Sequence, residues 1–246
     1  MKYVIINGSP RKKNTWSMVK QAKSNLDGEF EEIQLMKEKI PMCNGCFKCI
    51  MEGEDKCPHH ELINPILEKI RDADGLILAC PVYAMNVTAL LKNFFDHTAY
   101  LYHRPEFFDK KALIIVSTAG AGQKDVAKYI DETLRHWGFN KNYKITYACG
   151  GKDGINTEEI DKITKEFEKD IKSNKLHNPT FMDIIFYNVW RAMALTKDPI
   201  KADEEYWKET DLVSYDFAPN VKLNPVKKSF AKIMFFILKK VMKQTS

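Results

Sequence analysis

Short apolar runs alternate with longer segments of helical periodicity along the first 175 residues. The runs that predict strands are Lys2–Asn7, Phe30–Leu35, Gly75–Cys80, Lys111–Thr118 and Tyr143–Cys149. The segments with helical spacing are Thr15–Asn25, Glu61–Ala73, Thr88–Thr98, Lys124–Trp137 and Thr157–Ser173. Strands that alternate with helices of this length favour βαβ units with right-handed crossovers. We therefore predict an α/β fold with a doubly wound, five-stranded parallel sheet covered on both faces.

The carboxyl ends of the predicted strands are where a ligand is expected. In doubly wound sheets, including those of flavodoxin-like strand order, ligands bind beyond these ends at the topological switch point. The loops after the first, third and fourth predicted strands should meet there.

The first of these loops, Gly8–Thr15 (GSPRKKNT), offers groups that suit a phosphate monoester. It lacks the G-x-G-x-x-G pattern of dinucleotide sites and the G-K-[ST] of nucleoside triphosphate loops. It supplies hydroxyls from Ser9 and Thr15, and an amide from Asn14. The guanidinium of Arg11 can bind a phosphate bidentately, and the amino end of the following helix favours an anion. The alternative is an ordinary polar turn in which Asn14 or Thr15 caps the helix.

The other two loops suit a flat heterocycle. Cys80–Asp96 (CPVYAMNVTALLKNFFD) places a Pro-Val-Tyr turn at a strand end, and offers backbone amides beside an aromatic ring. Ser117–Gly122 (STAGAG) has small residues that let backbone N–H groups approach a ligand closely. The alternatives are a strand–turn–helix with a surface Tyr83, and a flexible loop.

Taken together and in order, INGSPRKKNT, PVYAMNVTALLKNFFD and STAGAG resemble the NAD(P)H-dependent FMN reductases, a flavodoxin-like family. The resemblance covers residues 1–175, implies FMN as the cofactor and NAD(P)H as the reductant, and implies a homodimer or larger assembly. The residues it assigns to the FMN phosphate are Ser9, Arg11, Asn14 and Thr15. Those it assigns to the isoalloxazine are Pro81, Val82, Tyr83, Met85 and Asn86, with Ser117, Thr118 and Gly120 on the other side. His97 departs from the family, which often has Arg after the Asp.

Four of the six cysteines lie in Cys43–Pro58 (CNGCFKCIMEGEDKCP), with C-x2-C-x2-C-x7-C spacing before a proline. This is close to the compact spacing of iron–sulfur ligands, because steps of two intervening residues let a tight loop present three thiolates. The stretch also resembles the iron–sulfur flavoproteins, a branch of the same family. By that resemblance Cys43, Cys46, Cys49 and Cys57 would hold a 4Fe–4S cluster.

Two alternatives for these thiols stay open. Four thiolates with His59 and His60 nearby also suit tetrahedral zinc, and the long last gap permits unligated thiols. The chain shows no signal peptide and no apolar run of the roughly 20 residues that span a bilayer. A cytoplasmic location is therefore predicted, where disulfides are rare. Cys80 and Cys149 lie at strand ends and are interpreted as packing residues.

These observations favour an FMN-dependent NAD(P)H oxidoreductase whose electron acceptor is unidentified. The flavin supplies the chemistry, so no catalytic side-chain acid or base is nominated. One alternative is an iron–sulfur flavoprotein that carries electrons between partner proteins such as ferredoxin. Another is a membrane-surface protein that kept the fold and lost the flavin.

Charge changes the picture only at the end of the chain. The net charge is +5, but Val226–Ser246 has six lysines and no acid, so the other 225 residues carry −1. A near-neutral body lacks the basic face of a nucleic-acid-binding protein.

Residues 176–246 lie outside the resemblance and are predicted to form a helical extension. Phe181–Leu195 is apolar nearly all round, which predicts burial against the main domain or a second subunit. Asp203–Asp211, which includes Tyr206 and Trp207, is predicted to be a solvated helix. The apolar residues predicted to share one face of the last helix are Val226, Phe230, Ile233, Met234, Ile237, Leu238 and Val241. This helix would pack on the body or a partner subunit, or would lie on an anionic membrane surface.

Overall fold

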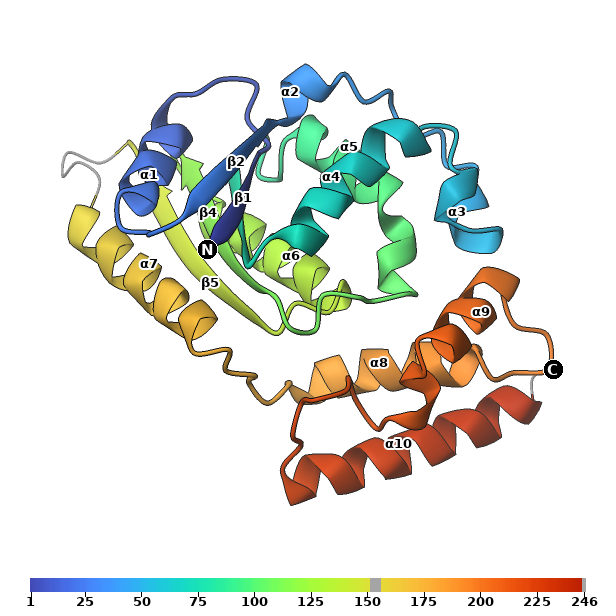
Figure 1. The fold of residues 1–246 in the computed structure, drawn as a ribbon. Coiled ribbons are helices and arrows are strands. Elements are labelled where there is room, and N and C mark those ends of the chain that lie inside the picture. Colours follow the sequence, from blue (N-terminus) through green and yellow to red (C-terminus); the bar gives the residue numbers. More distant parts are fainter. Residues whose placement is uncertain (151–155, 245–246) are drawn as a thin grey trace.

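A computed structural model describes residues 1–150 and 156–244 of the chain (Figure 1). Its centre is a sheet of five parallel strands in the order β2-β1-β3-β4-β5. The strands are β1 (Lys2–Asn7), β2 (Glu29–Gln34), β3 (Gly75–Pro81), β4 (Lys111–Thr118) and β5 (Lys141–Ala148). The predicted flavodoxin-like, doubly wound fold is confirmed, with β5 beginning two residues earlier than expected.

Helices cover both faces of the sheet because successive strand residues point to opposite sides. Val4 and Ile6 of β1 pack with α4, α5 and α6, while Tyr3 and Ile5 pack with α1 and α7. These helices are α1 (Asn14–Lys23), α4 (His60–Asp72), α5 (Ala89–His97), α6 (Gln123–His136) and α7 (Thr157–Lys172). β4 is buried along its whole length, as expected for a continuous apolar run inside a parallel sheet.

Short helical pieces were not predicted, because three or four residues show too little periodicity to be recognised. They are α2 (Leu35–Glu38), α3 (Lys48–Met51), η1 (Glu54–Lys56), η2 (Ala99–Tyr102) and η3 (Leu212–Ser214). Two of them, α3 and η1, shape the cysteine-rich stretch.

The C-terminal extension consists of α8 (Phe181–Met193), α9 (Lys201–Glu209), η3 and α10 (Pro225–Gln244). α8 begins with a capping box, in which the Thr180 side chain accepts from the Asp183 N–H and the Asp183 carboxylate accepts from the Thr180 N–H. The predicted burial of this helix is confirmed on one side only, where Ile184 and Tyr187 are buried. On its other side, exposed large apolar side chains include Phe181, Met182, Phe186 and Met193.

The solvated environment predicted for the acidic helix is confirmed for Glu205 and Glu209, which are exposed, but it is wrong for the side that carries Asp203 and Trp207. Trp207 of α9 is fully buried, and its indole N–H donates to the carbonyl of His103 at 2.9 Å. Asp203 is also buried, because its carboxylate pairs with Arg104 and with the ring of His103. A carboxylate can leave solvent when it is paired and hydrogen-bonded, and sequence composition does not show that pairing.

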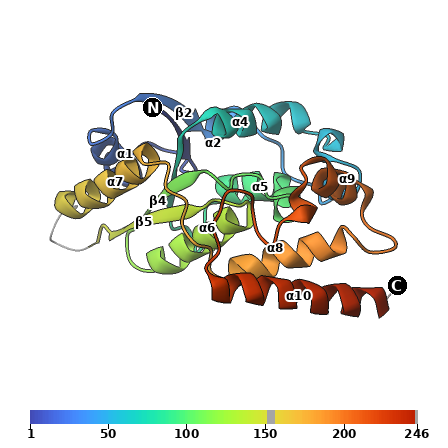
Figure 2. The ribbon, with the colours of Figure 1, turned by 60° about the horizontal axis from the view of Figure 1, so that its bottom comes forward.

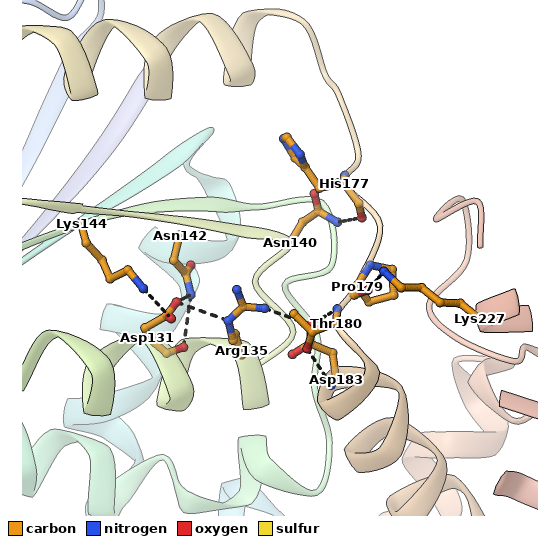
Figure 3. A network of polar contacts seen from close by, with 10 residues as sticks. All are labelled: Asp131, Arg135, Asn140, Asn142, Lys144, His177, Pro179, Thr180, Asp183 and Lys227. Atoms are coloured by element: carbon orange, nitrogen blue, oxygen red, sulfur yellow. Dashed lines mark hydrogen bonds and ion pairs between the residues drawn. The ribbon is translucent and has the colours of Figure 1, made fainter. Parts of the chain in front are cut away.

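A polar network joins the extension to the main domain (Figure 3). Arg135 of α6 contacts Asp183 of α8 at 2.9 Å and Asp131 at 3.4 Å. The connecting segment is held by Asn140, whose side-chain carboxamide donates to the His177 carbonyl and accepts from the His177 N–H. The extension is thus tied to α6 and to the start of β5, at the edge of the sheet.

The last helix is divided between a packed side and an open side. α10 runs beside α8 at the side of the molecule remote from the sheet (Figure 2). Ala231 is buried and Arg191 of α8 lies over the ring of Phe235. The predicted apolar face is therefore only partly covered, and the residues that expose large apolar side chains are Val226, Ile233, Phe236, Ile237 and Val241. The side chain of Lys243, counted among the tail lysines, lies outside the described residues. Within 1–150 and 156–244, no helix has both the length and the apolar character that crossing a membrane demands.

Candidate functional site

The loop after β1 is held in place by neighbouring polar side chains. The Asn7 carboxamide accepts from the Ser9 N–H at 3.0 Å and donates to Gln34 at 2.7 Å. Gln34, the last residue of β2, in turn donates to the Ser9 carbonyl. Thr88, just before α5, donates its hydroxyl proton to the Gly8 carbonyl at 2.6 Å. The first ligand loop is therefore fixed from two sides before any ligand binds.

The amino end of α1 fits an anion. Lys13 occupies the N-cap position, and no side chain among the described residues caps this end. The alternative in which Asn14 or Thr15 caps the helix is thus wrong, because both residues lie inside the helix, and the Thr15 hydroxyl lies 2.6 Å from the Ser117 hydroxyl. Free backbone N–H groups in a first turn without acids favour a bound phosphate.

The loop after β3 makes a tight turn at the sheet edge. Tyr83 and Asn86 exchange two backbone hydrogen bonds of 2.9 Å, and the two residues between them have positive φ angles, 47° for Ala84 and 62° for Met85. A left-handed conformation costs roughly 1–2 kcal/mol for a residue with a Cβ. Such strain concentrates at ligand-binding sites, and here it presents the exposed Met85 side chain above the loop.

The loop after β4 completes the edge. A Cβ built on Gly120 would find no described atom within 4 Å, so the space beside this residue is open. Gly122 has a φ of 90° and packs close beneath the end of Met85. The Val82 N–H donates to the Ser117 carbonyl at 2.8 Å, and Arg11 reaches the Tyr83 hydroxyl at 3.4 Å. The structure thus brings together the three loops that were predicted to meet.

The cysteine-rich stretch runs along α5 toward the extension (Figure 1). Near its start, the Cys43 N–H donates to the Asn93 carboxamide at 2.8 Å. Near its end, Cys57 Sγ lies 3.7 Å from Nδ1 of His97, the last residue of α5. Asn93 is five residues beyond Thr88, which is about 8 Å along a helix. The stretch therefore starts within about two helical turns of the three loops at the carboxyl edge of the sheet and leads away from them.

The thiols of this stretch influence one another. Burial raises the pKa of Cys49 to about 11, with further raising contributions from Cys57, Cys43 and Cys46, while Arg104 opposes them. Burial also raises the pKa of Cys57. All four cysteines are unpaired by disulfides, and Cys46 is exposed. Metal ligation requires thiolates, so a metal or cluster bound here would displace protons from Cys49 and Cys57.

The ligand-atom distances do not favour one zinc ion on four cysteines. Zn–S bonds of about 2.3 Å place tetrahedral sulfur ligands about 3.8 Å apart. In the described part of the chain, the one group of three ligand atoms within 4.8 Å of one another comes from Cys57, His59 and His97. His60, which was predicted as a zinc neighbour, instead places Nδ1 3.0 Å from the Glu54 carbonyl.

Arg104 connects the cysteine-rich stretch to the extension. Its side chain is 2% exposed and donates to the carbonyls of Cys49 and Ile50, which lie in α3. The same guanidinium pairs with Asp203 of α9 at 2.6 Å. The extension therefore braces the stretch through a buried ion pair, which no pattern in the sequence indicated.

A cavity of about 480 Å³ lies elsewhere, between α6 and α8. Its walls include Phe108, Gly138 and Asn140, which precede β4 and β5. It therefore borders the amino ends of these strands, whereas the three predicted ligand loops lie at the carboxyl ends. Charged residues of its lining already form ion pairs: Arg135 pairs with Asp131 and Asp183, and Lys128 pairs with Glu132.

Comparison with known proteins agrees with this geometry. Residues 1–142 match the family model of NADPH-dependent FMN reductases. The chain belongs to the NADPH-dependent FMN reductase family. As a member of this family it is an oxidoreductase that binds FMN and uses NAD(P)H as its reductant. The predicted activity and the predicted cofactors FMN and NAD(P)H are therefore confirmed.

Individual relatives extend the match beyond the family model. An iron–sulfur flavoprotein of Archaeoglobus fulgidus is 31% identical over 227 residues, covering 87% of this chain and 100% of the relative. One from Methanosarcina thermophila is 30% identical over 179 residues, covering 68% and 93%. Among solved structures, the NAD(P)H:quinone oxidoreductase of Methanothermobacter marburgensis has the same fold at 18% identity, with a TM-score of 0.53 over 73% of this chain and 99% of that one.

Several residues that the structure brings to these sites were not predicted. Asn93 of α5, Arg104 from the loop after η2 and Asp203 of α9 act on the cysteine-rich stretch, and Cys149 lies beside Asn14 at the start of α1. The position of His97 after the Asp was a usable signal, because it marked a departure from the family. No comparable sequence signal marked Asn93, Arg104 or Asp203, since the residues that each of them contacts lie far away in the sequence.

Proposed function

We propose that the enzyme holds FMN at the edge formed by the three loops, in residues 1–175. Arg11 and the amino end of α1 would bind the phosphate, with Ser9, Asn14 and Thr15 beside it. The tight turn supplies Pro81, Val82, Tyr83, Met85 and Asn86 to the isoalloxazine, and Ser117, Thr118 and Gly120 line its other side. The open space beside Gly120 and the absence of a capping side chain on α1 among the described residues support this assignment. FMN accepts hydride from NAD(P)H, and the chain's own residues position it.

We further propose that Cys43, Cys46, Cys49 and Cys57 hold a 4Fe–4S cluster, and that electrons leave through it to an acceptor. The observation that carries this proposal is the donor set: four cysteines without disulfides in one loop, in which Cys43 and Cys46 lie close enough to contribute to the raised pKa values of both Cys49 and Cys57. Of the three acids that lie between Cys49 and Cys57, two form ion pairs: Asp55 with Lys56, and Glu54 with Arg104. Soft thiolates select iron–sulfur clusters or zinc rather than hard cations.

The cluster is tested by composition and by reduction. Anaerobically prepared protein is expected to contain about four iron and four sulfide per chain. Cys46→Ser should lose both while keeping FMN, because Cys46 is exposed and supports no packing. Lys48→Ser, which changes an exposed residue of the same stretch without removing a thiol, is the matched control and should keep iron and sulfide. Anaerobic NADPH should bleach the flavin of both variants.

Two results would contradict this proposal. The first is a content of one zinc per chain and no iron, which would show that the cysteines hold zinc and not a cluster. The second is full electron delivery to every acceptor by a metal-free Cys46→Ser protein, which would show that no cluster is needed. Reduction of the flavin by ferredoxin but by neither nicotinamide would favour the alternative of an electron carrier between proteins.

For the extension, residues 176–246, we propose self-association in a reducing cytoplasm. α8 and α10 expose a set of large apolar side chains, and such patches mark interaction surfaces. A second copy suits this surface because a two-fold interface brings the same patch of two subunits together, so the exposed apolar side chains of α8 and α10 would cover those of the second copy.

Phe236→Lys is expected to convert the dimer into a monomer, because Phe236 is 70% exposed and a lysine there would be desolvated by a partner. Light scattering on a sizing column measures the mass, with Lys232→Ala as the control on the same helix. A wild-type monomer would overturn the proposal. Retention of that monomer on anionic vesicles, lost in Phe236→Lys, would assign the surface to a membrane.

A further inference from the structure

Three ligand-type side chains from different elements meet at the carboxyl end of α5. Cys57 follows η1, His59 occupies the N-cap position of α4, and His97 is the last residue of α5. One ligand atom from each lies within 4.8 Å of the other two. The rings of His59 and His97 meet edge to face, with centroids 5.1 Å apart.

The orientation of His97 is set by its other nitrogen. Nε2 lies 2.9 Å from the Pro41 carbonyl oxygen. A carbonyl only accepts hydrogen bonds, so Nε2 carries the proton and the lone pair of the neutral ring is on Nδ1. Nδ1 is the atom that faces Cys57 Sγ, and the His97 ring is 2% exposed. A ring whose far nitrogen donates to a carbonyl, with its near nitrogen free to ligate, is the usual arrangement of a metal-binding histidine.

The distance between the two atoms also suits a shared metal. Zn–N bonds of about 2.0–2.1 Å and a Zn–S bond of about 2.3 Å place the N and S ligands of a tetrahedral ion about 3.6 Å apart. The separation of Cys57 Sγ and His97 Nδ1 is 3.7 Å. A thiol hydrogen bond to Nδ1 would fit this distance too, but it gives His59 no role.

We propose that the chain, when it holds no cluster, binds one divalent transition metal through Cys57, His59 and His97, with zinc as the natural occupant. A small cavity of about 10 Å³ borders Cys57 and His97. It has room for about one water, which would be the fourth ligand. The site would exclude a cluster on Cys57, since both use the same thiolate. This inference does not rest on the proposed cluster, because neither His59 nor His97 belongs to the four-cysteine set.

The test uses the reduced, chelator-treated full-length protein and Co²⁺ as a spectroscopic substitute for Zn²⁺. One Co²⁺ per chain is expected, with the visible absorption of a tetrahedral ion and a thiolate charge-transfer band. His59→Ala and His97→Ala should each weaken binding by more than the roughly 10–100-fold that loss of an outer-sphere partner costs. Because His97 is buried, His97→Ala alone could lose binding through misfolding of the chain. His59 is half-buried, so His59→Ala tests the same site with less disturbance of the core.

The matched controls separate this site from the four-cysteine set. Cys46→Ser and His60→Ala should keep the Co²⁺ spectrum, and competition with Zn²⁺ should abolish it. Binding that is lost in Cys46→Ser and kept in His97→Ala would overturn the proposal in favour of a four-thiolate site. Absence of Co²⁺ binding to the folded protein would overturn it as well. Iron and sulfide content, measured separately on reconstituted protein, decides the cluster without reference to these results.

Discussion

Replacing Asp203 with Ala is expected to lower the free energy of unfolding by about 3 kcal/mol, because it leaves a buried guanidinium with only the more distant and partly exposed Glu54, at 3.6 Å, as a counter-charge. Arg104 and Asp203 are both nearly inaccessible and their charged atoms lie 2.6 Å apart. The same substitution removes the link between α9 and the carbonyls of Cys49 and Ile50. Denaturant unfolding measures the first effect. The rate at which the cysteine thiols of metal-free protein react with an alkylating reagent measures the second, and it should rise.

Two control variants test this prediction: one changes another acid of α9, and the other removes both members of the Arg104–Asp203 ion pair. Glu204→Ala removes a surface pair with Lys208 and should change stability by less than about 1 kcal/mol. Arg104→Met combined with Asp203→Ala should be less destabilised than Asp203→Ala alone, because no unpaired buried charge is left. If Asp203→Ala were as mild as Glu204→Ala, the ion pair would not be what holds the extension to the cysteine-rich stretch.

Arg11→Ala is expected to weaken FMN binding by about 10–100-fold, in line with about 1.5–3 kcal/mol for a hydrogen bond to a charged group. Arg11 is exposed in this structure and contacts the Tyr83 hydroxyl, so its loss leaves no cavity in the core. Riboflavin lacks the phosphate, and its affinity should change little. Fluorescence quenching titrations of the two flavins against the flavin-free protein give both constants.

The neighbouring Lys12 provides the comparison. It pairs with Glu32 at 2.8 Å and lies over the ring of Trp16, so its charge is already engaged. Lys12→Ala should therefore affect FMN much less than Arg11→Ala does. An equal loss of FMN and riboflavin in Arg11→Ala would show that this residue shapes the loop rather than binding the phosphate.

The sequence by itself determined the sheet and the helices that cover it. Continuous apolar runs such as Leu113–Val116 and periodic segments such as Ile63–Ile70 are local signals, because each reflects the face that one element must bury. The loops at the carboxyl ends of β1, β3 and β4 could also be predicted, since the order of elements along the chain decides which strand ends share an edge. The four cysteines could also be identified as a candidate ligand set from the sequence, because their spacing is a local pattern within one short stretch.

The tertiary structure alone decided how those cysteines are held. Asp203 lies 99 residues from Arg104, and His97 lies 40 residues from Cys57, so nothing in either local pattern indicates the pairing. The acidic composition around Trp207 predicted a solvated helix, yet the indole fills the space beside Tyr187 and the carboxylate meets a buried guanidinium. A charged group can be buried only if the fold places a group of opposite charge beside it. Here that group is distant in the sequence, and only the folded chain brings the two together.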